Sequence, residues 1–223
     1  MITVLMATYQ GRQYLEQQLD TILAQTVPVK ILISDDGSDD GTREMLDNYA
    51  GWYPEQVVLH HRTEHTGGAA GNFFWLMQEA LKDEKNEYIL FSDQDDVWEN
   101  DKVSVMLHRM KVLEKGLGSA CPILLYSDME VVDEELYEIS PSFASYTHQD
   151  PDRSSFAELL VENQVTGGAS MINRALLMRC AKAPEVCCMH DWWIALTASC
   201  FGIIEFMPRA LPKYRQHGNN VLG

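Results

Sequence analysis

The sequence predicts an α/β fold in which a mostly parallel sheet carries helices on both faces. Short apolar runs alternate with longer amphipathic segments through residues 1–98, which is the pattern of consecutive strand-loop-helix units. The runs end in polar or acidic residues, as strands that present a binding edge do. With 223 residues, 46% of them hydrophobic, the chain is long enough to bury one substantial core.

The first half of the chain supplies four predicted strands. Apolar runs place them at 2–7, 31–34, 57–61 and 88–91. Helical patterns cover 14–23 and 73–81, the second entered through a Gly-rich segment at 66–72. Because each strand is followed by a loop and a helix, the loops are expected to gather at one edge of the sheet.

The second half has a different pattern. A strand is predicted at 123–128, followed by a short excursion near a sheet edge at 129–140. Residues 141–155, rich in Pro, Ser, Tyr and His, are expected to form a mobile loop over the site. The chain then returns to the sheet at 165–172, and residues 191–200 are predicted to be helical.

Three carboxylates follow the fourth predicted strand, at Asp93, Asp95 and Asp96. Carboxylate oxygens at the carboxyl edge of an open sheet suit a divalent cation that bridges phosphates, which indicates a nucleotide-diphosphate site. The alternative is an acidic turn that caps the helix beginning near Asn100.

A second acidic loop, containing Asp35, Asp36, Asp39 and Asp40, follows the second predicted strand. Four like charges on one short loop repel each other, so some are expected to serve a ligand while Asp39 or Asp40 caps the next helix. Two neighbouring strand ends therefore carry paired aspartates, which favours a ligand site over two separate helix caps.

Six motifs in chain order resemble those of family 2 glycosyltransferases, and bacterial rhamnosyltransferase-like members in particular. The similarity spans essentially residues 1 to 220. The motifs are Ala7-Thr8-Tyr9-Gln10-Gly11, Ser34-Asp35-Asp36-Gly37-Ser38, Asp93-Gln94-Asp95-Asp96-Val97-Trp98, Gly167-Gly168-Ala169-Ser170, His190-Asp191-Trp192-Trp193 and Tyr214-Arg215-Gln216-His217-Gly218-Asn219-Asn220.

This resemblance implies the A-type glycosyltransferase fold, with a Rossmann-like sheet. Residues 1–223 are then one catalytic domain, made of a nucleotide-binding half at 1–98 and an acceptor-binding half at 99–223. The reaction implied is inverting sugar transfer, which needs a general base for the acceptor hydroxyl. By resemblance the base is Asp191; its position also suits an N-cap of the last predicted helix, and the two roles are compatible.

The resemblance also implies a metal site that takes Mn²⁺ or Mg²⁺. Asp95 is the expected direct ligand, with Asp93 near the ribose and counted as a further metal ligand. His217 adds an imidazole from the C-terminal loop, a donor that suits manganese better than magnesium. The alternative for His217 is an exposed histidine of the tail.

Residues of several loops are implied in binding the nucleotide sugar. An aspartate that accepts a hydrogen bond from a pyrimidine N3–H is the family's usual device, which favours uridine or thymidine over guanosine and leaves open whether Asp35 or Asp36 serves. Tryptophans 98, 192 and 193 either pack in the core or stack on an acceptor sugar. The expected donor-binding residues are Thr8, Tyr9, Arg12, Asp35, Asp36, Asn72, Asp93 and Arg215.

Charge and cysteine content agree with this interpretation. A formal net charge of −16 disfavours nonspecific nucleic-acid binding, and a divalent cation would reverse the local field where an anionic diphosphate binds. The five cysteines lack paired zinc-site spacing and are expected to be free thiols. No stretch is apolar enough for a membrane span, so a cytoplasmic chain is predicted; the alternative is peripheral association with the inner membrane face through a missing C-terminal segment.

The sequence thus predicts an inverting, metal-dependent glycosyltransferase that uses a UDP- or dTDP-sugar, with rhamnose as one candidate. The acceptor is expected to be a saccharide or lipid-linked saccharide in the synthesis of a bacterial surface polysaccharide. Two alternatives stay open: a nucleotidyltransferase, and a non-catalytic module that binds nucleotide sugars.

Overall fold

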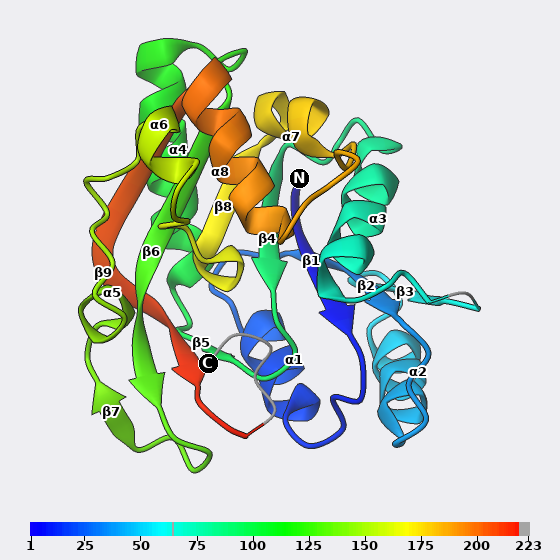
Figure 1. The fold of residues 1–223 in the computed structure, drawn as a ribbon. Coiled ribbons are helices and arrows are strands. Elements are labelled where there is room, and N and C mark those ends of the chain that lie inside the picture. Colours follow the sequence, from blue (N-terminus) through cyan, green and yellow to red (C-terminus); the bar gives the residue numbers. More distant parts are fainter. Residues whose placement is uncertain (64, 219–223) are drawn as a thin grey trace.

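The computed structural model describes residues 1–63 and 65–218, and Figure 1 shows one twisted sheet between two layers of helices. Over these residues nine strands join in the spatial order β3-β2-β1-β4-β8-β6-β9-β5, with β7 paired to β6. The strands are β1 Ile2–Thr8, β2 Lys30–Asp35, β3 Val57–His61, β4 Tyr88–Ser92, β5 Val97–Trp98, β6 Ile123–Val132, β7 Glu138–Ser140, β8 Ser170–Asn173 and β9 Ile203–Arg215.

The sheet has a parallel part and a mixed part. Strands β3, β2, β1 and β4 run parallel to one another, as predicted for the first half of the chain. Strand β8 is antiparallel to both β4 and β6, whereas β6 and β9 run parallel. The predicted α/β class is confirmed, and the antiparallel β8 joins the two halves into a single sheet.

Helices cover both faces, as expected. The described helices are α1 Leu15–Leu23, α2 Thr42–Trp52, α3 Ala69–Leu81, α4 Lys102–Leu117, α5 Phe143–Tyr146, α6 Phe156–Leu159, α7 Arg174–Cys180 and α8 His190–Phe201. Alternate side chains of β1 point to opposite faces: Val4 and Met6 pack with α1, α2 and α4, while Leu5 packs with α3, α7 and α8. All three side chains are fully buried, so each face has its own hydrophobic core.

Strand β9 is the main element that the sequence does not predict: residues 203–213 carry no prediction, and His217 is expected on a C-terminal loop. Pro208 and Pro212 obscure the strand signal, since proline cannot donate to a ladder. The strand forms because β6 pairs along most of its length, from Ile123↔Ile203 to Val132↔Arg215. Residues 219 and 220 of the last motif lie outside the described residues.

Smaller differences concern where elements begin and end. Helix α3 starts at Ala69, four residues before the predicted Phe73, so Asn72 belongs to its first turn. Strand β6 continues through residues 129–132, and α5 occupies part of the predicted loop 141–155. The predicted return to the sheet at 165–172 is a strand only from Ser170, because residues 167–169 form a 3-10 turn.

Gly202 connects α8 to β9 at a close backbone approach. A Cβ atom added there would lie 1.8 Å from the carbonyl oxygen of Pro122, which accepts the Ile203 N–H at 3.0 Å. The β6–β9 pairing therefore begins where only glycine fits.

We expect Gly202→Ala to lower the free energy of unfolding by about 1–3 kcal/mol, because the methyl group forces β9 away from Pro122. Gly116→Ala is the matched control: nothing lies within 4 Å of an added Cβ in α4, and alanine there should raise stability by about 0.5–1 kcal/mol. Urea denaturation measures both. A Gly202→Ala protein as stable as the unmodified chain would contradict the close approach.

Candidate active site

Polar residues gather where the parallel strands end. In the sheet register Thr8 lies opposite Asp35, and Asp35 lies opposite His61. Ser92 ends β4 beside β1, and the acidic turn from Asp93 to Asp96 follows directly. Both acidic loops of the sequence therefore meet at the carboxyl edge of one sheet, as expected for a ligand site in an open α/β fold.

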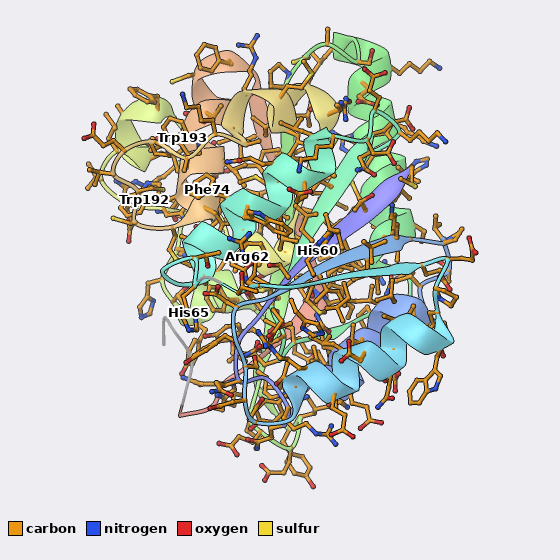
Figure 2. The ribbon with its side chains drawn as sticks, turned by 90° about the vertical axis from the view of Figure 1, so that its right-hand side faces the viewer. His60, Arg62, His65, Phe74, Trp192 and Trp193 are labelled. Carbon is orange, nitrogen blue, oxygen red and sulfur yellow. The ribbon has the colours of Figure 1, made fainter. Side chains whose placement is uncertain are left out.

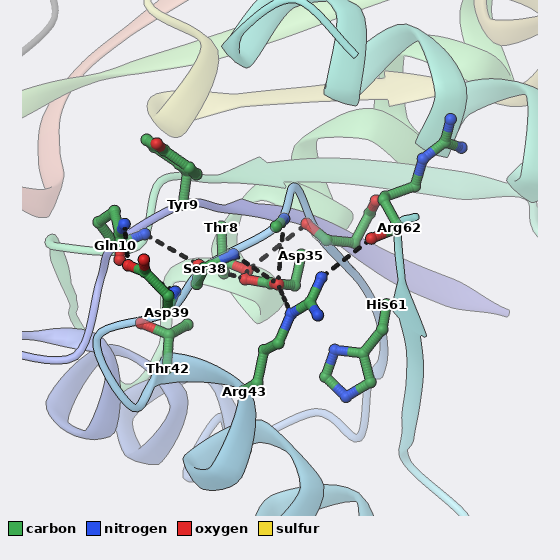
Figure 3. A network of polar contacts seen from close by, with 12 residues as sticks. Thr8, Tyr9, Gln10, Asp35, Ser38, Asp39, Thr42, Arg43, His61 and Arg62 are labelled. Atoms are coloured by element: carbon green, nitrogen blue, oxygen red, sulfur yellow. Dashed lines mark hydrogen bonds and ion pairs between the residues drawn. The ribbon is translucent and has the colours of Figure 1, made fainter. Parts of the chain in front are cut away.

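Asp35 is fully buried and its two carboxylate oxygens are used inside the protein (Figure 3). One oxygen accepts the hydroxyls of Ser38 at 2.5 Å and Thr8 at 3.2 Å. The other accepts Arg43 Nε at 2.8 Å and the backbone N–H of Ser38 at 3.1 Å. Burial alone would raise the pKa of Asp35, but the bonds from Ser38 and Arg43 outweigh it and hold the pKa below its ordinary value.

Asp36 is held differently, although it is also mostly buried. Its oxygens accept the backbone N–H of Thr66 at 2.8 Å and the Thr66 hydroxyl at 2.9 Å. Both donors come from the loop that precedes α3, so Asp36 faces that loop while Asp35 faces the strand ends. Of the two aspartates, Asp36 keeps more acceptor capacity for a ligand.

Gln94 fixes the acidic turn to the first loop. Its side-chain amide accepts the Tyr9 N–H and donates to the Tyr9 carbonyl, both at 2.9 Å, in the manner of a paired strand. The Tyr9 ring is 53% exposed and meets the His65 ring edge-on at 6.3 Å between centroids. The backbone of Tyr9 is thus anchored while its aromatic face is available to a ligand.

Asp95 faces the end of β9. His217 Nε2 lies 2.9 Å from Asp95 Oδ2, and the imidazole stacks on Tyr14 at 5.0 Å between centroids. The His217 side chain is only 7% exposed, so the alternative of an exposed tail histidine is wrong. Arg215 donates to the Asp95 carbonyl at 2.9 Å and to Gln17 Oε1 at 2.5 Å, which ties β9 to the acidic turn.

The Asp95–His217 pair fits a divalent cation. Asp95 Oδ2 and His217 Nε2 lie at a hydrogen-bond distance of 2.9 Å, which is also compatible with the separation of about 3 Å between two adjacent donors on an octahedral ion with bonds of about 2.1 Å. A carboxylate with a neutral imidazole suits Mn²⁺. Within residues 1–63 and 65–218, no group of three or more His, Cys, Asp or Glu side chains has metal-binding geometry.

Asp93 and Asp96 lie deeper, beside the buried Lys102. Burial raises the pKa of Asp93 to about 7, the charges of Asp95 and Asp191 add to the rise, and Lys102 opposes it. Burial, followed by Asp93 and Asp95, raises the pKa of Asp96 well above its ordinary value. Two adjacent glycines join Asp93 to Asp191: a Cβ added at Gly168 would lie 2.9 Å from Asp93 Oδ2, and Gly167 donates its N–H to Asp191 Oδ2 at 3.1 Å.

Asp191 lies in the first turn of α8, and the N-cap prediction is wrong because Met189 is the N-cap residue. Its Oδ2 accepts the Gly167 N–H at 3.1 Å, and its Oδ1 accepts the Trp192 N–H at 2.6 Å and Asn163 Nδ2 at 3.3 Å. Burial raises its pKa to about 6, although these bonds favour the ionised form. A carboxylate with that pKa suits a general base near neutral pH.

Other predicted residues lie in different surroundings. The Arg12 guanidinium turns toward Met45 on α2, where Nη1 lies 3.6 Å from Sδ. Asn72 donates to the Ser34 carbonyl at 2.9 Å, and its buried Oδ1 has no partner among the described residues. The Thr8 hydroxyl serves Asp35, and the Arg215 guanidinium is buried against the Asp95 turn.

The core-packing expectation is confirmed for one of the three tryptophans. Trp98 is 3% exposed and packs in the core. Trp192 and Trp193 are half-buried at the start of α8, and their indole N–H groups donate to the carbonyls of Leu159 and Cys180 (Figure 2). The five cysteines are free thiols, as predicted.

Three contributors to the site escaped the sequence analysis: Gln94, Lys102 and Asn163. Gln94 is the central residue of the Asp93-Gln94-Asp95 segment, so its position could have suggested a link to a neighbouring loop. Lys102 follows the acidic turn in sequence, but a lone lysine at a helix start reads as exposed. No local signal identifies Asn163, whose contact with Asp191 joins residues 28 positions apart.

The fold and site define a glycosyltransferase of the A-type fold. Two solved structures share it at sequence identities that show the fold alone. S. aureus TarS in complex with UDP-GlcNAc has a TM-score of 0.67 and 16% identity, covering 98% of this chain and 59% of TarS 1–349. Mannosyltransferase PcManGT from Pyrobaculum calidifontis, with GDP-Man and Mn²⁺, has a TM-score of 0.65 and 19% identity, covering 96% and 56% of the two chains.

The chain belongs to glycosyltransferase family 2: the family described as Glycosyl transferase family 2 matches residues 3–179. It is 28% identical over 229 residues to the dTDP-rhamnosyl transferase RfbG of Shigella flexneri. The aligned region covers 98% of this chain and 73% of RfbG. The predicted enzyme class is confirmed, and the nucleotidyltransferase alternative is set aside. No helix among the described residues is long and apolar enough to cross a membrane.

We expect Asp35→Asn to lower the free energy of unfolding by about 2 kcal/mol, because Arg43 and two hydroxyls lose a charged acceptor. Asp36→Asn is the matched control and should cost under about 1 kcal/mol, since an amide oxygen still accepts the Thr66 N–H. The folded-state pKa of Asp35 is lowered from 3.8. The unmodified chain should therefore be more stable than Asp35→Asn at neutral pH, and this difference in the free energy of unfolding should shrink as pH falls below 3.8. If urea titrations show that Asp35→Asn and Asp36→Asn lower the free energy of unfolding equally, the proposed difference between the two aspartates is wrong.

Proposed function

We propose that this enzyme moves a sugar, with inversion, from a nucleotide diphosphate sugar to a saccharide acceptor, assisted by a divalent cation. One observation carries the proposal: two adjacent glycines join the acidic turn to Asp191. Gly167 donates its N–H to Asp191 Oδ2 at 3.1 Å, and a Cβ added at Gly168 would lie 2.9 Å from Oδ2 of Asp93, in the turn that continues to the Asp95–His217 pair. A metal-binding pair and a general base in one site are what inverting transfer requires.

The donor side is built from both acidic loops. Asp36 accepts the N3–H of a pyrimidine base, since Asp35 is saturated by Ser38, Thr8 and Arg43. The exposed Tyr9 ring lies over the base, and Asp93 contacts the ribose. The pyrimidine preference and the likeness to a dTDP-rhamnosyl transferase favour a dTDP- or UDP-sugar, with dTDP-rhamnose as the first to test.

Asp95 and His217 would hold Mn²⁺ or Mg²⁺. Asp93 is left out as a metal ligand, because its Oδ2 faces Gly168 and no group of three such side chains among the described residues has metal-binding geometry. The cation, when bound, offsets the charge of the departing diphosphate in a chain of net charge −16. Arg12 and Arg215 are left out of the proposed donor contacts, because Arg12 turns toward α2 and Arg215 anchors the Asp95 turn.

Asp191 takes the proton of the acceptor hydroxyl as the sugar is transferred. The Gly167 N–H and Asn163 Nδ2 orient its carboxylate, so its position depends on the turn before β8. The acceptor is a saccharide or lipid-linked saccharide of a bacterial surface polysaccharide. Residues 1–98 serve the nucleotide and residues 99–223 the acceptor.

A thermal-shift panel of UDP, dTDP and GDP, with Mn²⁺ or with chelator, tests the donor assignment. We expect UDP and dTDP to raise the melting temperature more than GDP does, and only with Mn²⁺. Asp95→Ala should abolish the metal-dependent shift without loss of fold, because the carboxylate belongs to a turn outside both hydrophobic cores. Calorimetry that finds equally tight UDP binding in chelator, or tighter GDP binding, would contradict the proposal.

We expect Asp191→Asn to lower the transfer rate by about 10²-fold while UDP affinity stays nearly unchanged, because the amide cannot accept the acceptor's proton. The unmodified enzyme should gain activity as pH rises through about 6, the pKa of Asp191. Stopped assays over a pH range measure both effects. Near-normal turnover in folded Asp191→Asn protein would assign the base elsewhere, with Asp128 as the next candidate.

The same raised pKa has a consequence for stability. Because the folded-state pKa of Asp191, about 6, exceeds its ordinary value of 3.8, folding favours the protonated carboxyl. The contribution of Asp191 to stability is therefore present below pH 3.8 and is lost as pH rises through 6. Urea titrations should show that Asp191→Asn lacks this part of the pH dependence.

A further inference from the structure

An open hollow of about 170 Å³ lies between helices α1 and α2, away from the candidate active site. A cavity of about 150 Å³ admits a benzene molecule, so there is room here for one six-membered ring. The hollow follows one face of α2 from Gly41, next to the second acidic loop, to Trp52, a helix length of about 15 Å. The side chains that the argument uses are Arg12, Glu16, Glu44, Asn48, Tyr49 and Trp52.

Trp52 gives the hollow an exposed aromatic ring on a fixed support. It is the last residue of α2, and 67% of it is exposed. Its ring centroid lies 5.4 Å from that of Tyr49, which is buried and donates its hydroxyl to Asp20 Oδ1 at 2.6 Å. An indole held against such a neighbour is ready to pack on the apolar face of a ligand, because it has little conformational freedom left to lose.

The polar side chains of the hollow are available to a ligand. Glu16, Glu44 and Asn48 are exposed, and their side chains form no hydrogen bond or ion pair with the residues that the structure describes. The Arg12 guanidinium contacts only Met45 Sδ, at 3.6 Å, among those residues. The carboxylates and the amide oxygen accept hydrogen bonds, while the amide and guanidinium N–H groups donate them.

The charges of the hollow disfavour a charged ligand. Glu16 and Glu44 repel an anion, in a chain whose net charge is already −16, whereas Arg12 is unfavourable for a cation. A neutral ligand with an apolar face and several hydroxyls can use the indole and the polar side chains together. A pyranose ring has both properties, because its C–H groups form an apolar face and its hydroxyls both donate and accept hydrogen bonds.

Arg12 connects this hollow to the candidate active site. Its backbone N–H donates to Asp40 Oδ2 at 3.1 Å, in the second acidic loop, while its guanidinium turns toward α2. The end of the hollow near Arg12 therefore adjoins the loops of the proposed donor site, and Trp52 marks the other end. A glycan of several residues is long enough to extend from one end to the other.

We propose that the hollow between α1 and α2 is a second saccharide-binding site. Trp52 stacks on a neutral pyranose ring, while Glu44 and Asn48 bind its hydroxyls. The ring belongs to a remote residue of the glycan acceptor; that assignment rests on the proposed function, whereas the binding of neutral glycosides does not.

Titrations followed by ligand-observed NMR test the binding. The neutral probes are the methyl glycosides of rhamnose, glucose, galactose, mannose and N-acetylglucosamine; methyl glucuronide is the anionic probe and choline the cationic one. Trp52→Ala removes the ring and Trp52→Phe keeps an aromatic face. Phe201→Ala is the matched control, because Phe201 also ends its helix, α8, and is 58% exposed.

We expect at least one neutral glycoside to bind, Trp52→Ala to weaken its binding about tenfold, and Trp52→Phe to weaken it less. Phe201→Ala should change little. Glu44→Gln should weaken the glycoside by less than about threefold, because an amide oxygen still accepts a hydroxyl, whereas choline binding would depend on the charge. With an oligosaccharide acceptor, Trp52→Ala should raise KM and leave kcat unchanged, since the ring touches no reacting group.

The proposal is overturned if no neutral glycoside binds, or if Trp52→Ala binds the glycosides as tightly as Phe201→Ala does. It is also overturned if a charged probe binds more tightly than every neutral one and loses that affinity in Trp52→Ala. Should Trp52→Ala not fold, Asn48→Ala takes its place, and unchanged affinity in that variant is equally contrary. If glycosides bind but the acceptor KM of Trp52→Ala is unchanged, the acceptor role is wrong. If the unmodified chain binds no nucleotide in Mn²⁺, the proposed function fails, and the glycoside titrations still decide the second site.

Discussion

The constraint on which this structure depends is the placement of several carboxylates at one edge of a sheet in a chain of net charge −16. Each carboxylate has its own partners. Asp35 accepts hydrogen bonds from Arg43 and two hydroxyls, Asp95 pairs with His217, and Asp191 accepts bonds from backbone N–H groups and Asn163. Burial raises the pKa of Asp93 and Asp96, and Lys102 opposes the rise. Burial and mutual repulsion favour protonated carboxyls, which are poor ligands for a metal and poor bases, and these partners work against that effect.

The mixed half of the sheet explains how residues distant in sequence reach that edge. Because β8 is antiparallel to β4, with Leu90 opposite Met171, the turn before β8 lies beside the carboxyl end of β4. That geometry brings Gly167 and Gly168 to the acidic turn. Because β9 is parallel to β6, its own carboxyl end delivers Arg215 and then His217 to the same place.

Packing and chemistry are divided between different parts of each strand. The middle residues of β1, β2 and β4 are fully buried against helices on both faces, which makes the sheet a rigid platform. The residues after each strand carry the polar groups and adopt turns instead. Such a division holds side chains in place for chemistry while leaving the reactive edge open to ligands.

The sequence by itself determined the α/β class, the four parallel strands and the two acidic loops, because apolar periodicity and strand-end polarity are local properties. It also predicted which residues gather at the edge, since Thr8, Asp35 and Asp93 each follow a recognisable strand. Only the tertiary structure decided how those residues differ. Asp35 and Asp36 are adjacent in sequence, yet one is saturated by Arg43 and Ser38 while the other faces Thr66. Lys102 is buried and donates to the Gly168 carbonyl, Arg12 turns away from the site, and β9 forms despite its prolines, because each outcome depends on partners supplied from elsewhere in the chain.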